Sequence, residues 1–167
     1  MRTIARLFFR KAYFLKARLR HIYWRFILEE MHPTVRVYGK IIVGYPGNIK
    51  VGAHSTLNDG VILNGRAPLI IGSHVHVSPF CALNTAGLDI SKTMGDRTHV
   101  VAPIVLEDGV WLGTNVLVSP GVRIGRNSVI GAGAVVTKDI PPNVLAAGVP
   151  AKTIRELTLD TEASQAD

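Results

Sequence analysis

The 167-residue chain contains a single cysteine, Cys81, so it can form no internal disulfide and no cysteine-based zinc site. Charged residues make up only 19% and hydrophobic residues 47%, a composition that excludes a disordered chain and predicts one folded domain. The first 28 residues hold no uninterrupted apolar run long enough for a signal peptide or a membrane-spanning helix. We therefore expect a reducing, cytoplasmic location.

Acidic residues are absent from residues 1–28, which carry eight of the 19 Lys and Arg residues. The rest of the chain has 11 basic and 12 acidic residues, so the net charge of +7 resides in this first segment. A body without excess positive charge predicts no nucleic-acid partner. The cations are Arg2, Arg6, Arg10, Lys11, Lys16, Arg18, Arg20 and Arg25.

Apolar residues recur at intervals of three and four in the same segment and predict an amphipathic helix within residues 1–30. They are Ile4, Phe8, Ala12, Leu15, Leu19, Ile22 and Phe26. Two interpretations stay open. The helix lies on the inner face of the cell membrane, with its cations on anionic headgroups, or it docks on its own domain or a neighbouring subunit.

A period of six follows over residues 31–155, which fits neither an α-helix nor a single strand. Six aliphatic residues repeat without interruption, at Leu106, Leu112, Val118, Ile124, Ile130 and Val136. An earlier array runs Val51, Leu57, Leu63 and then, after two extra residues, Ile71, Val77, Leu83. Short strands with corners at this spacing predict a solenoid, because the turns of a sandwich are further apart.

The segment 86–102 breaks the repeat and supplies no aliphatic residues at period six. A long loop inside a compact repeat is typically functional. Residues 156–167 are short and polar, and we expect a flexible tail there.

The runs IGAGAVVTKDIPPNVLAAGVPAKTIR (130–155) and DGVWLG (108–113), together with the period of six, resemble the hexapeptide-repeat acyltransferases. The likeness covers residues 49–156 and is greatest to galactoside, maltose and nodulation-factor O-acetyltransferases. It implies an all-β fold, a left-handed parallel β-helix with three hexads per coil. It also implies a homotrimer with sites between adjacent prisms, acetyl-CoA as the acyl donor and no metal.

The corners at Gly113, Gly131 and Ala132 lack bulky side chains, so a pantetheine arm could approach and form hydrogen bonds with their backbone. Nearby cations can bind the phosphates of the cofactor. The resemblance assigns Trp111 and Thr114 to the thioester end, and Ala132, Thr137 and Lys138 to the arm. It assigns Lys152 and Arg155 to the nucleotide end.

Acyl transfer to a hydroxyl needs a base, and histidine is best suited to that role near neutral pH. The chain departs from the family here, because Leu88 stands after Gly87 where the family's catalytic histidine stands. The first alternative is His99, which ends a Gly-Asp-Arg-Thr-His stretch similar to that of serine acetyltransferases. The second is His76, which coil stacking places near Ser78.

Candidates for acceptor binding are Asn58, which matches the family's acceptor-binding asparagine, and Asn84 and Arg97 at the loop. His54 and His74 are expected to stack on one solvated edge, and His21 and His32 to be structural. A metal site of His54, His74 and His76 is disfavoured, because no carboxylate or cysteine completes it. Cys81 falls at an inward position and is expected in the core.

The sequence thus supports an acetyl-CoA-dependent O-acetyltransferase acting on a sugar hydroxyl of a cell-surface polysaccharide or a lipid-linked glycan intermediate. Leu88 motivates a second hypothesis, a catalytically degenerate β-helix that binds acyl-CoA or a protein partner. N-acetylation of a nucleotide sugar, or acetylation of serine, is a third.

Overall fold

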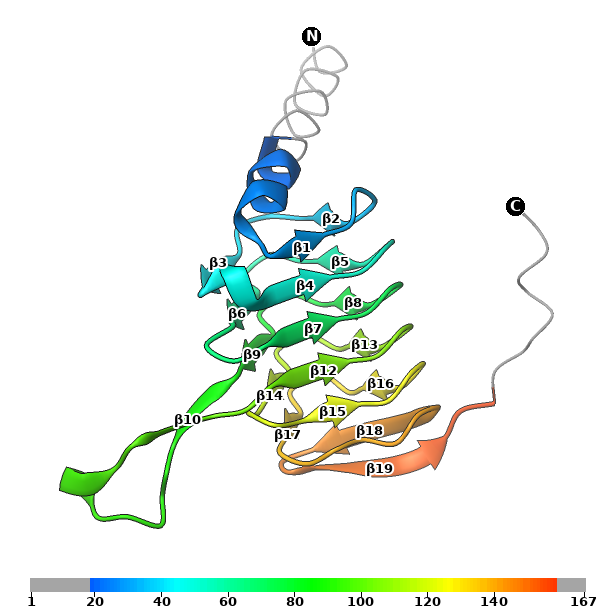
Figure 1. Ribbon diagram of the computed structural model, residues 1–167. Coiled ribbons are helices and arrows are strands. Elements are labelled where there is room, and N and C mark those ends of the chain that lie inside the picture. The colour runs from blue at the N-terminus through cyan, green and yellow to red at the C-terminus, as the bar shows by residue number, and fades with distance from the viewer. Residues whose placement is uncertain (1–18, 159–167) are drawn as a thin grey trace, which may run out of the picture.

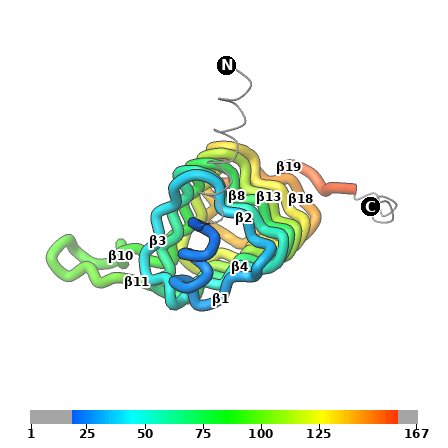
Figure 2. Tube along the Cα trace, turned by 90° about the horizontal axis from the view of Figure 1, so that it is seen from above, coloured from blue at the N-terminus to red at the C-terminus, as the bar shows by residue number. Residues whose placement is uncertain are grey.

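In the computed structural model, which describes residues 19–158, the chain winds into a stack of coils with three flat faces (Figures 1 and 2). Each face is a sheet built from one short strand of each coil. Sheet A contains β1 (Glu30–Met31), β4 (Ile49–Val51), β7 (Leu69–Ile71), β12 (Ile104–Leu106) and β15 (Arg123–Ile124). Sheet C contains β3 (Ile42–Gly44), β6 (Ile62–Asn64), β9 (Ala82–Asn84), β14 (Leu117–Val118) and β17 (Val135–Val136).

Sheet B is the longest face. It contains β2 (Arg36–Val37), β5 (Thr56–Leu57), β8 (His76–Val77), β13 (Trp111–Leu112), β16 (Val129–Ile130), β18 (Val144–Gly148) and β19 (Ala151–Glu156). All its pairings are parallel except the last, where β19 turns back along β18. We name the prism edges after the sheets they join: the AB, BC and CA edges.

The coil is left-handed, as the resemblance implies. Seen from the N-terminal end, the chain passes from sheet A to B to C counterclockwise as it recedes from the viewer (Figure 2). This hand is opposite to that of ordinary parallel crossovers. Early coils advance 20 residues, since Glu30 pairs with Lys50 and Lys50 with Ile70, whereas Val105 pairs with Arg123 after 18. The two extra residues predicted after Leu63 are confirmed.

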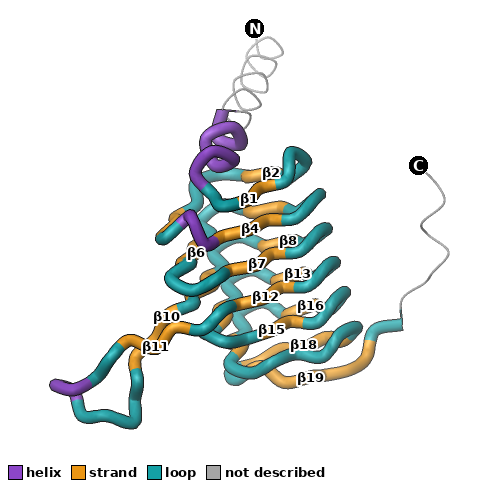
Figure 3. The backbone as a smooth tube through the Cα atoms, viewed as in Figure 1, coloured by secondary structure: helices purple, strands orange, loops and turns teal. Residues whose placement is uncertain are grey.

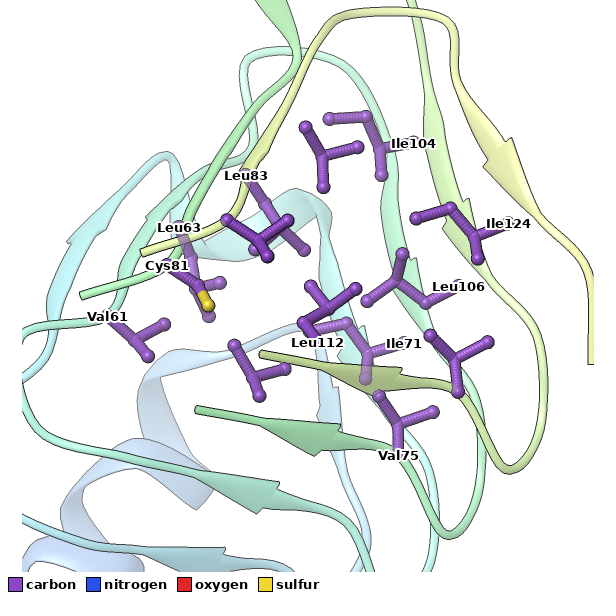
Figure 4. Close-up of a cluster of buried hydrophobic side chains, with 14 of the residues drawn as sticks. Val61, Leu63, Ile71, Val75, Cys81, Leu83, Ile104, Leu106, Leu112 and Ile124 are labelled. Carbon is purple, nitrogen blue, oxygen red and sulfur yellow. The ribbon is translucent and has the colours of Figure 1, made fainter. Parts of the chain in front are cut away.

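The predicted aliphatic positions form one continuous core along the prism axis (Figure 4). All twelve marker residues of the two arrays are buried. Four residues after the first five markers of the later array, a second row of small or β-branched side chains is also buried: Val110, Val116, Val122, Ser128 and Ala134. The buried hydroxyl of Ser128 donates to Pro141 O at 2.7 Å and accepts from the Val144 backbone N–H at 3.2 Å. Burying these rows on stacked coils is what holds the short strands together.

Cys81 belongs to the same core, as predicted. Its thiol donates to Gly113 O at 3.0 Å, and burial raises its pKa above the ordinary value. A buried, protonated thiol is a poor nucleophile, so Cys81 is a packing residue.

Two of the histidines, His54 and His74, lie at corners of the AB edge. His54 and His74 occupy left-handed backbone with φ of 57°, and Asn127 and Asn143 take the same conformation at the equivalent corners of later coils. Such corners favour residues that tolerate positive φ. The two imidazoles stack with their centroids 4.9 Å apart, which confirms the predicted solvated stack. Within residues 19–158, no group of three or more potential ligand side chains is placed to hold a metal ion.

A helix over residues 19–27 stands on the N-terminal end of the prism (Figure 1). Leu28, just after it, is buried, and Trp24 packs on the core. The predicted stripe faces away, because Leu19, Ile22 and Phe26 are all exposed, Phe26 by 86%. The expectation that this stripe docks on its own domain is therefore wrong for these three residues. The part of the stripe from Ile4 to Leu15 lies outside the described residues, as does the tail beyond residue 158.

The segment 86–102 leaves the prism at the CA edge as a hairpin (Figure 3). Its strands are β10 (Ala86–Leu88) and β11 (His99–Val101), paired antiparallel, and the short helix η2 (Met94–Asp96) lies near its tip. No helix in the described part of the chain is long and apolar enough to cross a membrane.

Candidate active site

The BC edge gathers the residues predicted at the thioester end. Trp111 projects outward from β13 and is half exposed, and its indole Nε1 donates to Ser78 Oγ at 3.2 Å. Ser78 and Asn58 occupy the same corner position in successive coils. The Asn58 amide donates to Val77 O at 2.8 Å, which fixes the side chain against the next coil.

Gly113 and Gly131 continue this edge toward the C-terminus; their N–H groups are used within the coil stack, and the contact of their backbone with a pantetheine arm stays a prediction. Gly113 N–H donates to Ile130 O and Gly131 N–H to Ala146 O, both at 2.8 Å. A Cβ on Gly113 would lie 2.7 Å from Ala132 N, so the coil stack itself requires glycine there. Ala132 is exposed, and its amide donates to no backbone carbonyl of the described chain.

The predicted cationic residues lie on two different edges. Lys152 pairs with Ala147, at the C-terminal end of the BC edge, and Arg155 pairs with Leu145 in the same hairpin. Thr137 and Lys138 follow β17 of sheet C. They come just before Ile140, which bridges to Ile124 of sheet A, so they lie on the CA edge. Sheet C separates the two groups within one chain.

The hairpin also lies on the CA edge, and it places one candidate base. Leu88 and His99 are directly paired across its strands, with Gly87 opposite Val100. Directly opposed residues of an antiparallel pair point to the same side, with Cβ atoms about 5 Å apart. The imidazole of His99 therefore stands beside the position that Leu88 occupies. His99 is exposed.

Asn84 and Arg97 have structural contacts in this region. Asn84 Oδ1 accepts from the Ala86 amide at 3.1 Å and from Asn64 Nδ2 at 2.9 Å, which braces the base of the hairpin. Arg97 Nε donates to Lys92 O at 3.2 Å near the tip. Both contacts hold the hairpin, and the assignment of these residues to the acceptor stays a prediction.

Asp89 follows Leu88 in the hairpin, and its backbone N–H donates to Thr98 O at 3.0 Å, beside the candidate base His99. Hydrogen bonds from the hydroxyl and the amide of Ser91 hold its pKa below the ordinary value. A carboxylate of lowered pKa is a weak proton acceptor, so Asp89 is suited to supporting the local turn and poorly suited to the role of a general base.

His76, the second candidate base, lies on the outer face of sheet B. Its Nδ1 lies 2.8 Å from Thr56 Oγ1, and it is directly paired with Trp111 in the next coil. It is therefore close to the thioester end of the BC edge in the same chain, whereas His99 lies on the other edge of sheet C.

Comparison with known proteins identifies this architecture. The profile of the bacterial transferase hexapeptide family (six repeats) matches residues 103–138. Galactoside O-acetyltransferase of Escherichia coli is 38% identical over 136 residues, which cover 78% of this chain and 67% of that protein. The chain belongs to this family. The predicted family, and with it the acyltransferase class, is confirmed.

A solved member of the hexapeptide-repeat acetyltransferases, from Vibrio cholerae in complex with acetyl-CoA, superposes with a TM-score of 0.78. It is 32% identical and is matched over 83% of this chain and 76% of its own. Galactoside O-acetyltransferase of Lactococcus lactis is 40% identical over 111 residues, and the chain spans only 54% of its length.

The family membership makes the departure at Leu88 more informative. Sequence reasoning weighed His99 for its local stretch and did not foresee that it faces Leu88. The pairing could have been found from the position of the turn, because a hairpin centred between Thr93 and Met94 pairs residue 88 with residue 99.

Proposed function

We propose that this protein transfers an acetyl group from acetyl-CoA to a hydroxyl of a sugar, in a cell-surface polysaccharide or a lipid-linked glycan intermediate. The observation that carries the proposal is the pairing of His99 with Leu88. This pairing puts the His99 imidazole beside position 88, where the resemblance to the family expects the catalytic histidine. The alternative of a degenerate binding protein rests on Leu88 alone, and this pairing removes its main support.

In this reaction the His99 imidazole takes the proton of the sugar hydroxyl as its oxygen attacks the thioester carbonyl. The carbon–sulfur bond then breaks, and the imidazolium returns the proton to the departing CoA thiolate. The products are the acetyl ester and CoA, with no acyl-enzyme. Lys138, Lys152 and Arg155 bind the phosphates of the donor, and the amide of Ala132 is free to bind its arm.

We further propose that the working form is the homotrimer implied by the resemblance, assembled through sheet C. The outer row of this sheet is apolar in every coil: Ile42, Ile62, Ala82, Leu117 and Val135. Three of these side chains are substantially exposed in the single chain. A contiguous exposed apolar surface is typical of a protein interface.

The division of the site supports the same assembly. Trp111 and Ala132 lie at one border of sheet C, whereas His99 and Lys138 lie at the other. Copies packed through sheet C would bring the BC edge of one chain to the CA edge of another. The base would then come from one chain and the thioester end from its neighbour.

The helix supports a membrane-associated acceptor. Leu19, Ile22 and Phe26 are uncovered, and Arg25 is exposed on the same helix, in a segment with eight cations and no acid. An apolar stripe flanked by cations is suited to the surface of an anionic bilayer. We propose that it holds the enzyme on the inner face of the cell membrane, where lipid-linked glycans are built.

Catalysis is tested by CoA release from acetyl-CoA with sugar acceptors. His99→Ala should lower kcat about 100-fold or more, the scale of a lost general base. His74→Asn is the matched control, because it removes an exposed imidazole at a corner where Asn stands in other coils. Loss of activity in His76→Ala alone would transfer the role to His76. Unchanged turnover in both variants would assign the base to neither histidine, and CoA binding without any turnover in the wild type would favour the degenerate binder.

Membrane binding is tested by co-sedimentation with vesicles of phosphatidylglycerol and phosphatidylcholine. The full chain should bind in 0.1 M salt and be weakened in 1 M, where the Debye length falls from about 10 Å to about 3 Å. Ile22→Asp combined with Phe26→Asp should abolish binding, whereas Ile70→Asp on sheet A should not. These variants keep Leu28 and Trp24, which a truncation at Met31 would remove from the core. Equal binding by the double variant would contradict the proposal.

A further inference from the structure

A groove of about 780 Å³ lies over the outer face of sheet B, between the N-terminal helix and the middle coils. Its floor is the row that leads to Trp111, since Arg36 pairs with Thr56, Thr56 with His76 and His76 with Trp111. The polar side chains along it are His21, Thr34, Arg36, Tyr38, His54, Thr56 and His76. The donor residues discussed above lie in the opposite direction, toward the C-terminus.

The groove is lined by one guanidinium, that of Arg36, by imidazoles and hydroxyl groups, and by no carboxylate. Arg36 is exposed, and its guanidinium forms no ion pair with any carboxylate of residues 19–158. Asp59, which follows β5 on the BC edge, accepts a hydrogen bond from the backbone N–H of Lys40 and does not line the groove. The guanidinium of Arg36 therefore attracts an anion, and no carboxylate lines the groove to repel it.

The spacing of these donors fits two linked anionic groups. Neighbouring coils stack about 4.8 Å apart, so Arg36 and His76, two coils apart in one row, are separated by about 9–10 Å along the groove. Thr56 lies between them and bonds the Nδ1 of His76, which leaves Nε2 to face the groove. A single carboxylate would reach only one end of this array.

We propose that the groove binds the diphosphate of a glycosyl diphosphate acceptor. The sugar would then lie at the Trp111 end of the row, next to the thioester, and the carrier at the helix end, near His21. This inference rests on the acetyl transfer proposed above, because it names the class of acceptor for that reaction. The carrier is either a nucleoside or a lipid, and both present the same diphosphate.

The test is calorimetric titration of the full chain with inorganic pyrophosphate in saturating CoA, which keeps the donor's phosphate-binding cations occupied. One pyrophosphate should bind per chain, and Arg36→Gln should weaken binding about 10-fold or more, the effect of losing a charge-assisted hydrogen bond. Arg126→Gln, an equal charge change on the AB edge, should leave the affinity unchanged. Binding that is absent, or equal in Arg36→Gln and the wild type, would overturn the proposal.

Further titrations identify the carrier. Binding of uridine diphosphate indicates a nucleotide-linked acceptor, and binding of a short polyprenyl diphosphate in micelles, but not of uridine diphosphate, indicates a lipid-linked one. Tighter binding of glucuronate than of pyrophosphate would overturn the diphosphate assignment. CoA release with a neutral pyranoside is measured in parallel on the wild type. Turnover without pyrophosphate binding refutes the groove alone, and pyrophosphate binding without CoA release on either the neutral pyranoside or a glycosyl diphosphate of the bound carrier refutes the acetyl transfer.

Discussion

Sheets B and C share one core but carry opposite chemistry on their outer faces. The outer row of sheet B runs Arg36, Thr56, His76, Trp111, Val129 and Leu145, so polar and aromatic groups give way to aliphatic ones. The outer row of sheet C is aliphatic throughout. Inward positions must be apolar to bury the coils, whereas outward positions are free to vary. The similar inner rows follow from the fold, whereas the different outer rows agree with the two roles proposed for them, an acceptor groove on sheet B and a subunit interface on sheet C.

The largest expected effect comes from charging the apolar row. Ile62→Asp combined with Leu117→Asp should dissociate the proposed trimer into chains of 18.1 kDa and abolish acetyl transfer, because the two edges of the proposed site would no longer meet. Light scattering after size exclusion gives the mass. Ile70→Asp on sheet A is the control, since Ile62 and Ile70 are both 40% exposed. A double variant that stays trimeric and active would show that sheet C is not the interface.

Moving the histidine from position 99 to position 88 tests whether either strand of the hairpin can supply the base. Leu88→His placed in the His99→Ala background should recover at least 10-fold of the roughly 100-fold loss in kcat, because residues 88 and 99 are directly opposed. Steady-state rates of CoA release measure the recovery. Leu88→Gln in the same background separates an imidazole from mere polarity. No recovery in the histidine variant would mean that His99 acts from another position.

The lysines proposed to bind the phosphates of acetyl-CoA lie on both edges, so their variants test the two edges together. Lys138→Ala on the CA edge and Lys152→Ala on the BC edge should each raise KM for acetyl-CoA about 10-fold with little change in kcat, because phosphate contacts bind substrate and transition state alike. Initial rates over a range of acetyl-CoA concentrations provide the measurement. An unchanged KM in both variants would remove the donor from this surface, and an effect of Lys152 alone would place the donor entirely on the BC edge.

At Gly113, on the BC edge, we expect an added methyl group to destabilise the fold. Gly113→Ala would set a Cβ 2.7 Å from Ala132 N and 2.9 Å from Ile130 O, both backbone atoms, and should cost about 1–3 kcal/mol of stability. Gly47→Ala is the control, because a Cβ there meets nothing within 4 Å. Thermal unfolding compares their Tm values. Equal Tm would show that the coils can move apart at this edge.

The smallest effect concerns the shared core. Because burial raises the pKa of Cys81, the thiol stays protonated to higher pH than a free cysteine, and it is also inaccessible. Iodoacetamide at pH 8 should leave the native protein unlabelled and label it fully in guanidinium chloride, as mass spectrometry would show. Rapid labelling of the native protein would indicate that the coils open near Cys81.

The repeat and the core were predictable because a solenoid buries its side chains at fixed intervals along the chain. The markers from Val51 to Val136, and the small residues between them, follow from stacking one coil on the next. The family likeness followed from the same regularity. Even the stack of His54 on His74 was predictable, since equal positions in successive coils become neighbours.

Contacts that do not follow the repeat were decided only by the tertiary structure. Leu88 faces His99 because a hairpin reverses the chain, and the repeat gives no register for that reversal. Gly113 and Gly131 looked available to a ligand, but the next coil uses their amides. Which helix residues cap the core and which stay exposed depended on the angle at which the helix leaves the first coil. A periodic sequence determines what lies inside, and three-dimensional packing determines which outward groups meet.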